Sequence, residues 1–183
     1  MGYDPWKVGR GTYLKELRNM AESPQDQGQE QPQYWIIVSS LDNWHKTVER
    51  GFTVQGMKSR HRKKAAQMKP GDKIIYYCTG VKAFAGITTI TSDFFEDHTP
   101  IWVSGNKKKA EEDYPFRVHI ERDLALGDED LVPAEPLARQ MVYARKWPAE
   151  NWTLAFQGNV HNVPREDYEL IRAEIEKAAL VAA

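Results

Sequence analysis

Short apolar stretches, rich in aromatic and β-branched residues, predict most of the strands in this chain. The run YWIIV at 34–38 is apolar throughout, which is typical of a strand buried on both faces. Alternation in KIIYYC places Ile74, Tyr76 and Cys78 on one face of a second strand. Similar composition and spacing predict three further strands, at 83–92, 114–123 and 152–158.

Helical spacing predicts three helices after residue 33. Ser39 or Ser40 is a suitable N-cap for the first, whose apolar face would consist of Leu41, Trp44 and Val48. The second is expected over 60–68. The third begins near Pro164 and carries an inward stripe formed by Tyr168, Ile171 and Ile175.

The order of these elements predicts an α+β fold. Short strands interleave with short helices, and the regular strand–helix–strand alternation of a doubly wound parallel sheet is missing from the pattern. We therefore expect a small barrel or strongly curved sheet with helices at its ends.

Residues 1–33 differ from the rest in pattern. Thr12–Ala21 has helical spacing, and the polar, Gln-rich segment ESPQDQGQEQPQ that follows is typical of a linker. The sequence thus predicts an N-terminal extension over 1–33 and a folded domain over 34–183.

Composition and charge narrow the classes of function. The chain of 183 residues has one cysteine, Cys78, which excludes an internal disulfide and a thiolate metal cluster. Neither a secretory signal nor an apolar run long enough to cross a bilayer is found, so we expect a cytoplasmic protein without membrane contact. Residues 34–125 have a net charge of +4, against −1 for the chain, so this half could attract an anionic ligand or simply present an uneven solvated surface.

Four segments together resemble the EVE domain family, which belongs to the PUA-like superfamily alongside the YTH domains. They are YWIIVSSLDNWHKTVERGF, RHRKKAAQMKPGDKIIYY, AFAGITTITSDFF and NWTLAFQGNVHNVPREDYELI, and the resemblance spans about residues 34–178. It implies a PUA-like mixed pseudo-barrel of about five or six strands. It also implies a module that binds DNA or RNA carrying a modified base, flipped out into an aromatic pocket.

Candidate pocket residues follow from this resemblance. Trp102 lies where YTH domains carry a tryptophan of the aromatic cage, although it could also pack its loop onto the barrel. Trp44 is a weaker candidate, because a Trp at helical spacing usually belongs to the core. Ser39 and Ser40 end the first strand, where the family places a serine at the pocket mouth; one of them can cap the helix while the other faces a base edge.

The opposite wall of the pocket is expected from the segment after Gly51. Relatives often carry Trp or Asn there, whereas this chain has Phe52, Val54 and Gln55, so its ligand could differ in size. The Gln55 amide offers both a donor and an acceptor to a base edge. Asn159, just before the last helix, is a further candidate.

The densest cationic run lies next to that wall, where it could contact phosphates or simply form a solvated helix face. The candidate phosphate ligands are Lys58, Arg60, His61, Arg62 and Lys63.

Catalytic motifs are missing from the sequence. The five histidines lack metal-ligand spacing, and the chain contains none of the patterns of a nucleophile elbow, a Walker loop or a dinucleotide fingerprint. We expect a binding module without a cofactor rather than an enzyme. Two alternatives stay open: a protein-interaction module without affinity for nucleic acid, and a nuclease or hydrolase with an unrecognised catalytic set.

Overall fold

The computed structural model describes residues 31–104 and 112–182. Contacts within the chain separate two compact units, Met1–Gln31 and Pro32–Ala183, and all described helices and strands belong to the second. The helix expected over Thr12–Ala21 and the Gln-rich segment up to Glu30 lie outside the described residues.

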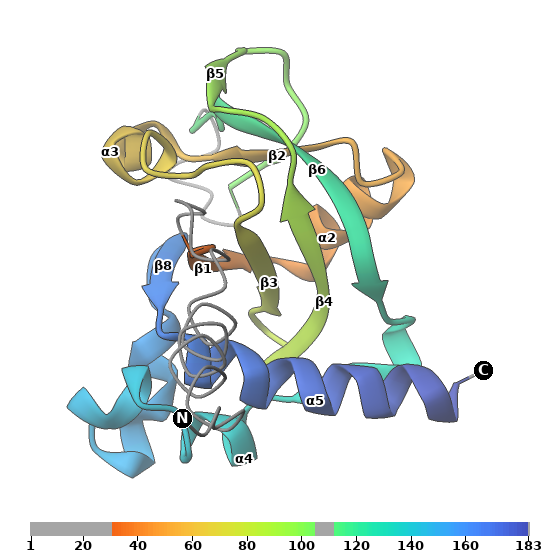
Figure 1. Cartoon of the computed structure of the whole chain (residues 1–183), viewed down its shortest axis with the longest axis vertical. Helices are drawn as coiled ribbons and strands as arrows, with labels where there is room; N and C mark the ends of the chain where they lie inside the picture. Colours follow the sequence, from red (N-terminus) through yellow and green to blue (C-terminus); the bar gives the residue numbers. More distant parts are fainter. Residues whose placement is uncertain (1–30, 105–111, 183) are drawn as a thin grey trace, which may run out of the picture. The chain divides into compact units, whose positions relative to one another are not determined.

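Strands and short helices alternate irregularly along the described chain (Figure 1). The strands are β1 (Tyr34–Ser39), β2 (Val54–Met57), β3 (Lys73–Cys78), β4 (Ala83–Ile90), β5 (Phe95–Glu96), β6 (Phe116–Ala125), β7 (Val132–Pro133) and β8 (Val160–Val163). The α-helices are α2 (Leu41–Glu49), α3 (Arg62–Ala65), α4 (Glu135–Ala138) and α5 (Arg165–Val181). The 3₁₀ segments are η1 (Ser59–His61), η3 (Asp128–Asp130), η4 (Tyr143–Lys146) and η5 (Ala149–Phe156).

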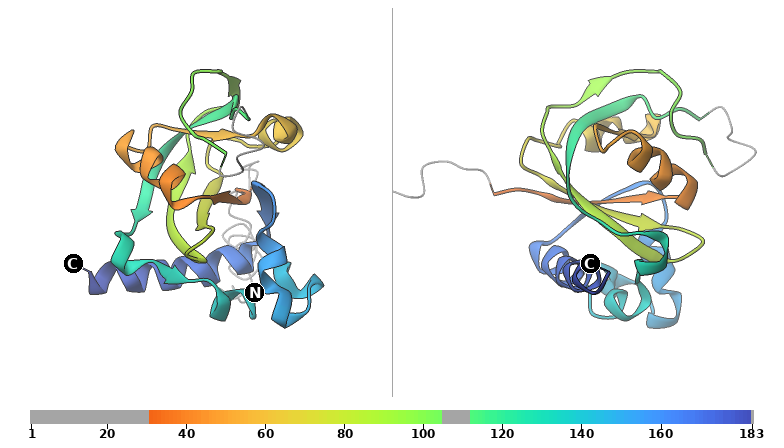
Figure 2. Two further views of the ribbon diagram at one scale, coloured as in Figure 1. Left: turned by 180° about the vertical axis from the view of Figure 1, so that it is seen from behind. Right: turned by 90° about the vertical axis from the view of Figure 1, so that its right-hand side faces the viewer.

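The strands of the described residues form one mixed sheet in the order β2-β6-β4-β3-β1-β8, with β5 beside β6 and β7 beside β4. β1 is parallel to β3 and antiparallel to β8. The sheet curls strongly, as the two further views show (Figure 2). This curled, barrel-like sheet with short helices around it confirms the predicted α+β fold.

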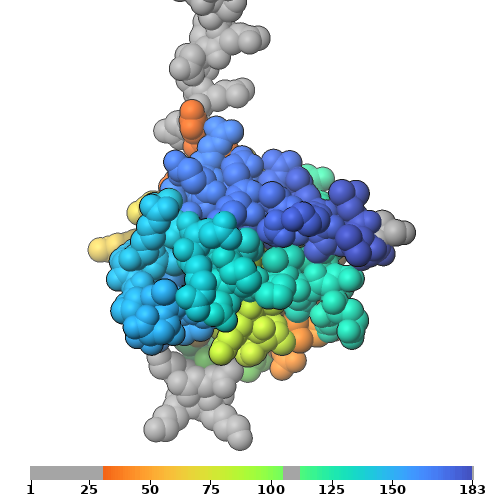
Figure 3. Space-filling view, turned by 90° about the horizontal axis from the view of Figure 1, so that it is seen from below, coloured from red at the N-terminus to blue at the C-terminus, as the bar shows by residue number. Residues whose placement is uncertain are grey.

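Apolar side chains on both faces of the central strands explain their uninterrupted hydrophobic runs. Trp35 and Ile37 of β1 face one cluster, which also contains Ile74, Tyr76 and Cys78 as predicted. Ile36 and Val38 face a second cluster, which the inward stripe of α5 and the segment between β7 and β8 complete. Seen from that end, α5 lies alongside this segment and both cover the sheet (Figure 3).

The Asp72 carboxylate connects the turn before β3 to the first residues of the domain. Its buried carboxylate accepts hydrogen bonds from Trp35 Nε1 at 3.0 Å, from the Gln33 backbone at 2.9 Å and from the Lys69 backbone at 3.1 Å. One side chain therefore joins the turn to the first residues of the domain and satisfies a buried indole.

Several elements differ from the sequence prediction. The stretch 152–158 is mostly 3₁₀ helix, because its buried residues Trp152, Ala155 and Phe156 follow a helical period that seven residues were too short to distinguish from a strand. The second helix is shorter than predicted, since η1 and α3 cover only 59–65. The strands β2 and β8 were not predicted, because pairing with β6 and β1 rather than local composition makes them strands.

The inward face of α2 also differs from the prediction. Val48 is exposed, whereas Asn43, Trp44 and Thr47 are buried. Ser40 is the N-cap, since its side chain accepts a hydrogen bond from the Asn43 backbone at 3.2 Å. Two polar residues of α2 therefore face inward, toward the candidate site.

Candidate functional site

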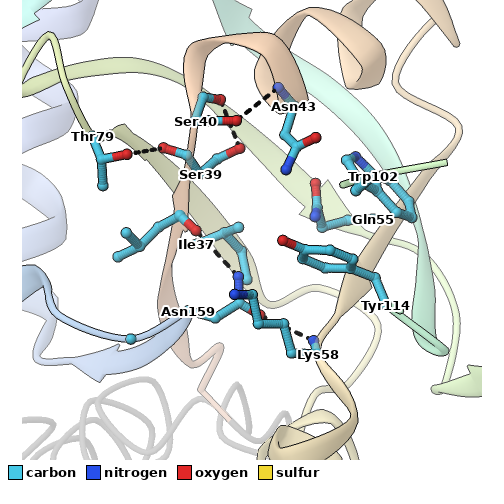
Figure 4. A pocket seen from close by; sticks show the side chains of 12 residues that line it. Ile37, Ser39, Ser40, Asn43, Gln55, Lys58, Thr79, Trp102, Tyr114 and Asn159 are labelled. Carbon is cyan, nitrogen blue, oxygen red and sulfur yellow. Dashed lines mark hydrogen bonds between the residues drawn. The ribbon is translucent and has the colours of Figure 1, made fainter. Parts of the chain in front are cut away.

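A cavity of about 140 Å³ lies between the end of β1, the start of α2, β2 and the segments that precede β6 and β8 (Figure 4). It is lined by Ile37, Val38, Ser39, Ser40, Asn43, Gln55, Lys58, Thr79, Trp102, Tyr114, Gly158 and Asn159. These residues come from distant parts of the sequence, so the curl of the sheet assembles the cavity.

Two aromatic side chains form one corner of the cavity. The ring centroids of Trp102 and Tyr114 are 6.1 Å apart, and their planes meet at 53°. Trp102 is only 5% exposed, and its Nε1 donates a hydrogen bond to Thr47 Oγ1 at 3.1 Å. The rings thus meet as adjoining walls and do not form a parallel sandwich.

Gly56 and Arg117 hold the indole of Trp102 from outside the cavity. A Cβ atom at Gly56 would lie 2.5 Å from Cζ3 of Trp102, so only glycine permits this approach. The guanidinium carbon of Arg117 lies 5.4 Å from the centroid of the same indole, within the range of a cation–π contact.

Arg117 also connects the two segments that carry the aromatic walls. It is 2% exposed and donates hydrogen bonds to the backbone carbonyls of Tyr114, at 3.1 Å, and of Thr99. An ion pair of 3.0 Å with Asp97 balances its charge. A buried arginine therefore fixes the backbone at both Thr99 and Tyr114.

Asn43 fixes the residue that follows Trp102. Its Nδ2 donates to the Val103 carbonyl at 2.7 Å, and its Oδ1 accepts from the Val103 N–H at 3.0 Å. Burial, and then the charge of Glu112, raise the pKa of Tyr114 to about 12, although a hydrogen bond with Asn43 acts in the opposite direction. The Tyr114 hydroxyl is therefore protonated at neutral pH and can donate a hydrogen bond.

Asn159 connects the end of β1 to the segment after β2. Its Nδ2 donates to the Val38 carbonyl at 3.1 Å, and its Oδ1 accepts from the Lys58 N–H at 3.1 Å. The Val38 N–H in turn donates to the Asn159 carbonyl at 2.8 Å. Three hydrogen bonds thus set the distance between these two walls.

Hydroxyl groups surround the opposite rim of the cavity. The Ser39 hydroxyl donates to the Ser40 carbonyl at 3.0 Å, and the Thr79 hydroxyl donates to the Ser39 carbonyl at 3.2 Å. On the floor, Gln55 Nε2 donates to the Gly56 carbonyl at 2.9 Å. The rim is therefore polar, and each of these side chains is held by the backbone beside it.

Positive charge continues from the cavity into η1 and α3. Lys58 and Arg60 both pair with Glu112, at 2.9 and 3.4 Å. His61 accepts a hydrogen bond from Arg60 Nε at 3.2 Å; burial and then Arg60, Lys64 and Lys58 lower its pKa to about 4. The exposed Lys63 and Arg62 follow, and Arg62 lies over the rings of Phe94 and Phe116 at 5.8 Å.

Six of the residues singled out from the sequence line this cavity: Ser39, Ser40, Gln55, Lys58, Trp102 and Asn159. Trp44 and Phe52 do not line it, because they pack against each other and Tyr76 in the core. Val54 lies behind Trp102 and Tyr114 in a small apolar cluster. We therefore leave Trp44, Phe52 and Val54 out of the candidate site.

Sequence reasoning missed Asn43, Thr79 and Tyr114. The sequence predicts a strand that begins at Tyr114, but β6 begins only at Phe116. The side chain of Tyr114 faces the cavity because Arg117 holds the Tyr114 carbonyl. Asn43 and Thr47 are four residues apart and so share a helix face. That polar pair was the available signal that the inner face of α2 does not belong entirely to the core.

Neither a candidate metal centre nor a reactive thiol is found in the described part of the chain. The described residues contain no group of three or more His, Cys, Asp and Glu side chains able to hold a metal ion. Burial, and then the charge of Asp128, raise the pKa of Cys78 to about 12, so its thiol is a poor nucleophile. A search of the described helices found none long and apolar enough to cross a membrane.

Comparison with known proteins confirms the resemblance expected from the sequence. The EVE domain family model matches residues 33–174. A UPF0310 protein from Pyrococcus abyssi is 28% identical over 148 residues, which cover 76% of this chain and 97% of the relative.

Solved structures with the same fold include two YTH domains. The YTH domain of the Zygosaccharomyces rouxii MRB1 protein, in complex with N6-methyladenosine RNA, has a TM-score of 0.57 at 16% identity, covering 84% of this chain and 93% of that one. The YTH domain-containing protein mmi1, in a complex with RNA, has a TM-score of 0.60 at 10% identity, covering 82% and 85%.

Proposed function

Because this chain belongs to the EVE domain family, we propose that its cavity binds a single nucleobase, extruded from a DNA or RNA strand and carrying a modification. The domain acts as a binding module and not as an enzyme. The observation that carries this proposal is the cavity itself, with two aromatic walls, a polar rim and cations beside its mouth. The complexes of related YTH folds with RNA support the same class of ligand.

The size of the cavity favours one heterocycle. Sites for drug-sized ligands usually occupy about 300–1,000 Å³, whereas this cavity measures about 140 Å³. A base that enters it would stack on one of the two rings and meet the other with its edge, because the planes are inclined at 53°. Base–aromatic stacking contributes roughly 1–3 kcal/mol per base.

Polar groups suited to the edge of a base remain available on two sides. The Tyr114 hydroxyl keeps its proton at neutral pH. A primary amide has two N–H donors, and Asn159 Nδ2 uses one of them for the Val38 carbonyl, which leaves the other for a ligand. The base would accept hydrogen bonds from these donors while the Ser39 side offers hydroxyl and backbone groups.

Cations of η1 and α3 would hold the strand that the base has left. Lys58 lines the cavity, and Arg60, Arg62 and Lys63 follow it, whereas His61 among them is neutral at neutral pH and would contribute a hydrogen bond. Contacts between cations and phosphates release counterions, so the affinity should fall steeply as salt rises.

The test is a fluorescence titration with single-stranded DNA and RNA oligonucleotides that carry different modified bases, at two salt concentrations. We expect one modified base to quench tryptophan fluorescence more strongly than its unmodified counterpart, and to bind more weakly at the higher salt. Trp102→Ala should reduce this affinity at least about tenfold, the equivalent of about 1.4 kcal/mol of lost stacking.

Val103→Ala is the matched control, because the exposed Val103 side chain lies next to Trp102 in sequence and does not line the cavity. It should leave the affinity unchanged. The proposal is wrong if no oligonucleotide binds, as a protein-interaction module predicts, or if Trp102→Ala binds as well as the unaltered chain. Turnover of the oligonucleotide would instead favour a nuclease or hydrolase.

A further inference from the structure

A second group of cationic side chains converges at the free edge of β8. This strand ends the sheet, and Lys64 Nζ of α3 donates to its Val160 carbonyl at 2.5 Å. The neighbouring His161 side chain meets the Tyr143 hydroxyl through Nδ1 at 2.7 Å. Lys146 Nζ lies 4.2 Å from the centroid of that tyrosine ring. Three segments thus bring two lysines and a histidine to one place.

One ring nitrogen of His161 has no geometric hydrogen-bond partner in the part of the chain that the structure describes. The residue is 8% exposed, and its Nε2 is buried without a hydrogen-bond partner. A Cβ atom at Gly158 would lie 4.0 Å from this nitrogen, and Gly158 lines the cavity. The unpartnered nitrogen therefore lies beside the mouth of the cavity, where an orphaned polar atom calls for a ligand or a functional explanation.

The charges of this group also lack a counterpart among the described residues. Lys58 and Arg60 share the carboxylate of Glu112, but neither Lys64 nor Lys146 forms an ion pair with a described carboxylate. Burial, and next the charge of Lys146, lower the pKa of Lys64. Two lysines therefore repel each other at a place where an anion would relieve the repulsion.

The same lysines also lower the pKa of His161. Burial, then the charges of Lys64, His61 and Lys146, lower the pKa of His161 to about 4, although the Gln157 backbone acts in the opposite direction. The ring is therefore neutral at neutral pH. A bound anion would oppose the field of the lysines and favour a proton on the imidazole.

We propose that Lys64, Lys146 and His161 form a subsite for one phosphate group of the strand whose base enters the cavity. The lysines supply the fixed charge, and the imidazole Nε2 donates to a phosphate oxygen, either as the N–H of the neutral ring or after the ring takes a proton from solvent. The identity of the strand rests on the proposed function, whereas the affinity for phosphate rests on these three side chains alone. The subsite lies next to Gly158, so the phosphate would flank the inserted base.

The subsite can be tested with inorganic phosphate by following the imidazole resonances of the full chain by NMR. Phosphate should raise the titration midpoint of His161 by about one pH unit relative to chloride of equal ionic strength, as expected when an anion replaces repulsion by attraction. Lys64→Met and Lys146→Met should each weaken phosphate binding by about five- to tenfold, the range of one charge-assisted contact. Lys177→Met on α5 is the control, since Lys177 is exposed and pairs with Glu174.

An unchanged His161 midpoint would overturn the subsite, as would a shift that survives both lysine substitutions, because the anion would then bind elsewhere on the basic surface. The oligonucleotide titration separates this inference from the proposed function. If phosphate raises the titration midpoint of His161 but no oligonucleotide quenches tryptophan fluorescence, the phosphate subsite is supported and the proposed base pocket is wrong. If an oligonucleotide binds in a way that depends on Trp102 but leaves the titration midpoint of His161 unchanged, only the phosphate subsite is wrong.

Discussion

Gly56 and Trp102 lie in such close contact that the backbone of β2 serves as the support of the indole. A Cβ atom at Gly56 would come within 2.5 Å of Cζ3 and 2.9 Å of Cε3 of that ring. It would also lie 2.8 Å from the Tyr114 carbonyl, which cannot move away as a flexible side chain can. One glycine therefore determines where both aromatic walls stand.

Gly56→Ala should displace the Trp102 indole and weaken ligand binding by tenfold or more. Overpacking of this kind usually costs about 1–3 kcal/mol of stability. Near-ultraviolet circular dichroism would report the displaced indole, and the oligonucleotide titration would report the affinity. Gly71→Ala is an instructive comparison because a Cβ there meets no atom within 4 Å, although its φ of +95° strains the backbone. If Gly56→Ala kept both the spectrum and the affinity, the support that we assign to Gly56 would be wrong.

Arg117→Leu should loosen the segments that carry Trp102 and Tyr114. The substitution removes the donors to the Tyr114 and Thr99 carbonyls and leaves Asp97 without its buried partner. Each unsatisfied buried group costs about 1–3 kcal/mol. Urea denaturation would measure the loss, and tryptophan emission of the folded variant should move to longer wavelength as the indole gains water.

Arg117→Lys tests whether the hydrogen bonds of the guanidinium or only its positive charge support the segments of Trp102 and Tyr114. A lysine keeps the positive charge but cannot form the same fork of hydrogen bonds. We expect partial recovery of stability and little recovery of affinity. Full recovery of both would mean that the charge alone matters.

Asp72→Ala should destabilise the domain without touching the cavity. It leaves the buried Trp35 indole N–H and two backbone N–H groups without their acceptor, at about 1–3 kcal/mol for each buried donor. Asp72→Asn retains one acceptor oxygen and should lose less. A thermal melt of both variants checks the order, and equal melting temperatures would contradict the role given to Asp72.

Stability should fall as the pH decreases from about 6.5 toward about 4. Within this window His61 and His161 stay neutral in the folded chain, because their pKa values lie near 4, but both take up protons when the chain unfolds. The unfolded state then binds more protons, so the free energy of unfolding decreases with falling pH. His161→Gln should show a weaker dependence than the unaltered chain, measured by urea denaturation at about pH 7 and about pH 5.

The central strands were predictable because their apolar runs reflect burial on both faces. Alternation alone placed Ile74, Tyr76 and Cys78 together, and the structure has them in one cluster. β2 and β8 could not be found in the same way. VQGM contains a glycine at the contact with Trp102, and VHNV contains the polar residues His161 and Asn162, so tertiary pairing decides the conformation of both segments.

The candidate site was predictable only where a residue carries its signal locally. The resemblance to the EVE and YTH domains indicated Trp102, Ser39 and Ser40, and their positions in an irregular segment and at the end of a clear strand agreed with it. Tyr114 has no such signal, because it reaches the cavity through contacts with Arg117, which a one-dimensional pattern does not contain. Trp44 was the weaker candidate because a Trp at helical spacing usually belongs to the core, and the structure has its indole buried against Gly86.

The amide of Asn159 has a consequence for selectivity. This amide joins the Val38 carbonyl to the Lys58 N–H before any ligand arrives. The width of the opening between β1 and the segment after β2 is therefore determined by the length of one short side chain. A molecule of the right width can bind without drawing the two walls together. A wider molecule can enter only if the hydrogen bonds of Asn159 break. For the proposed ligand, we therefore expect selection at this opening to be steric and to come before recognition by any functional group.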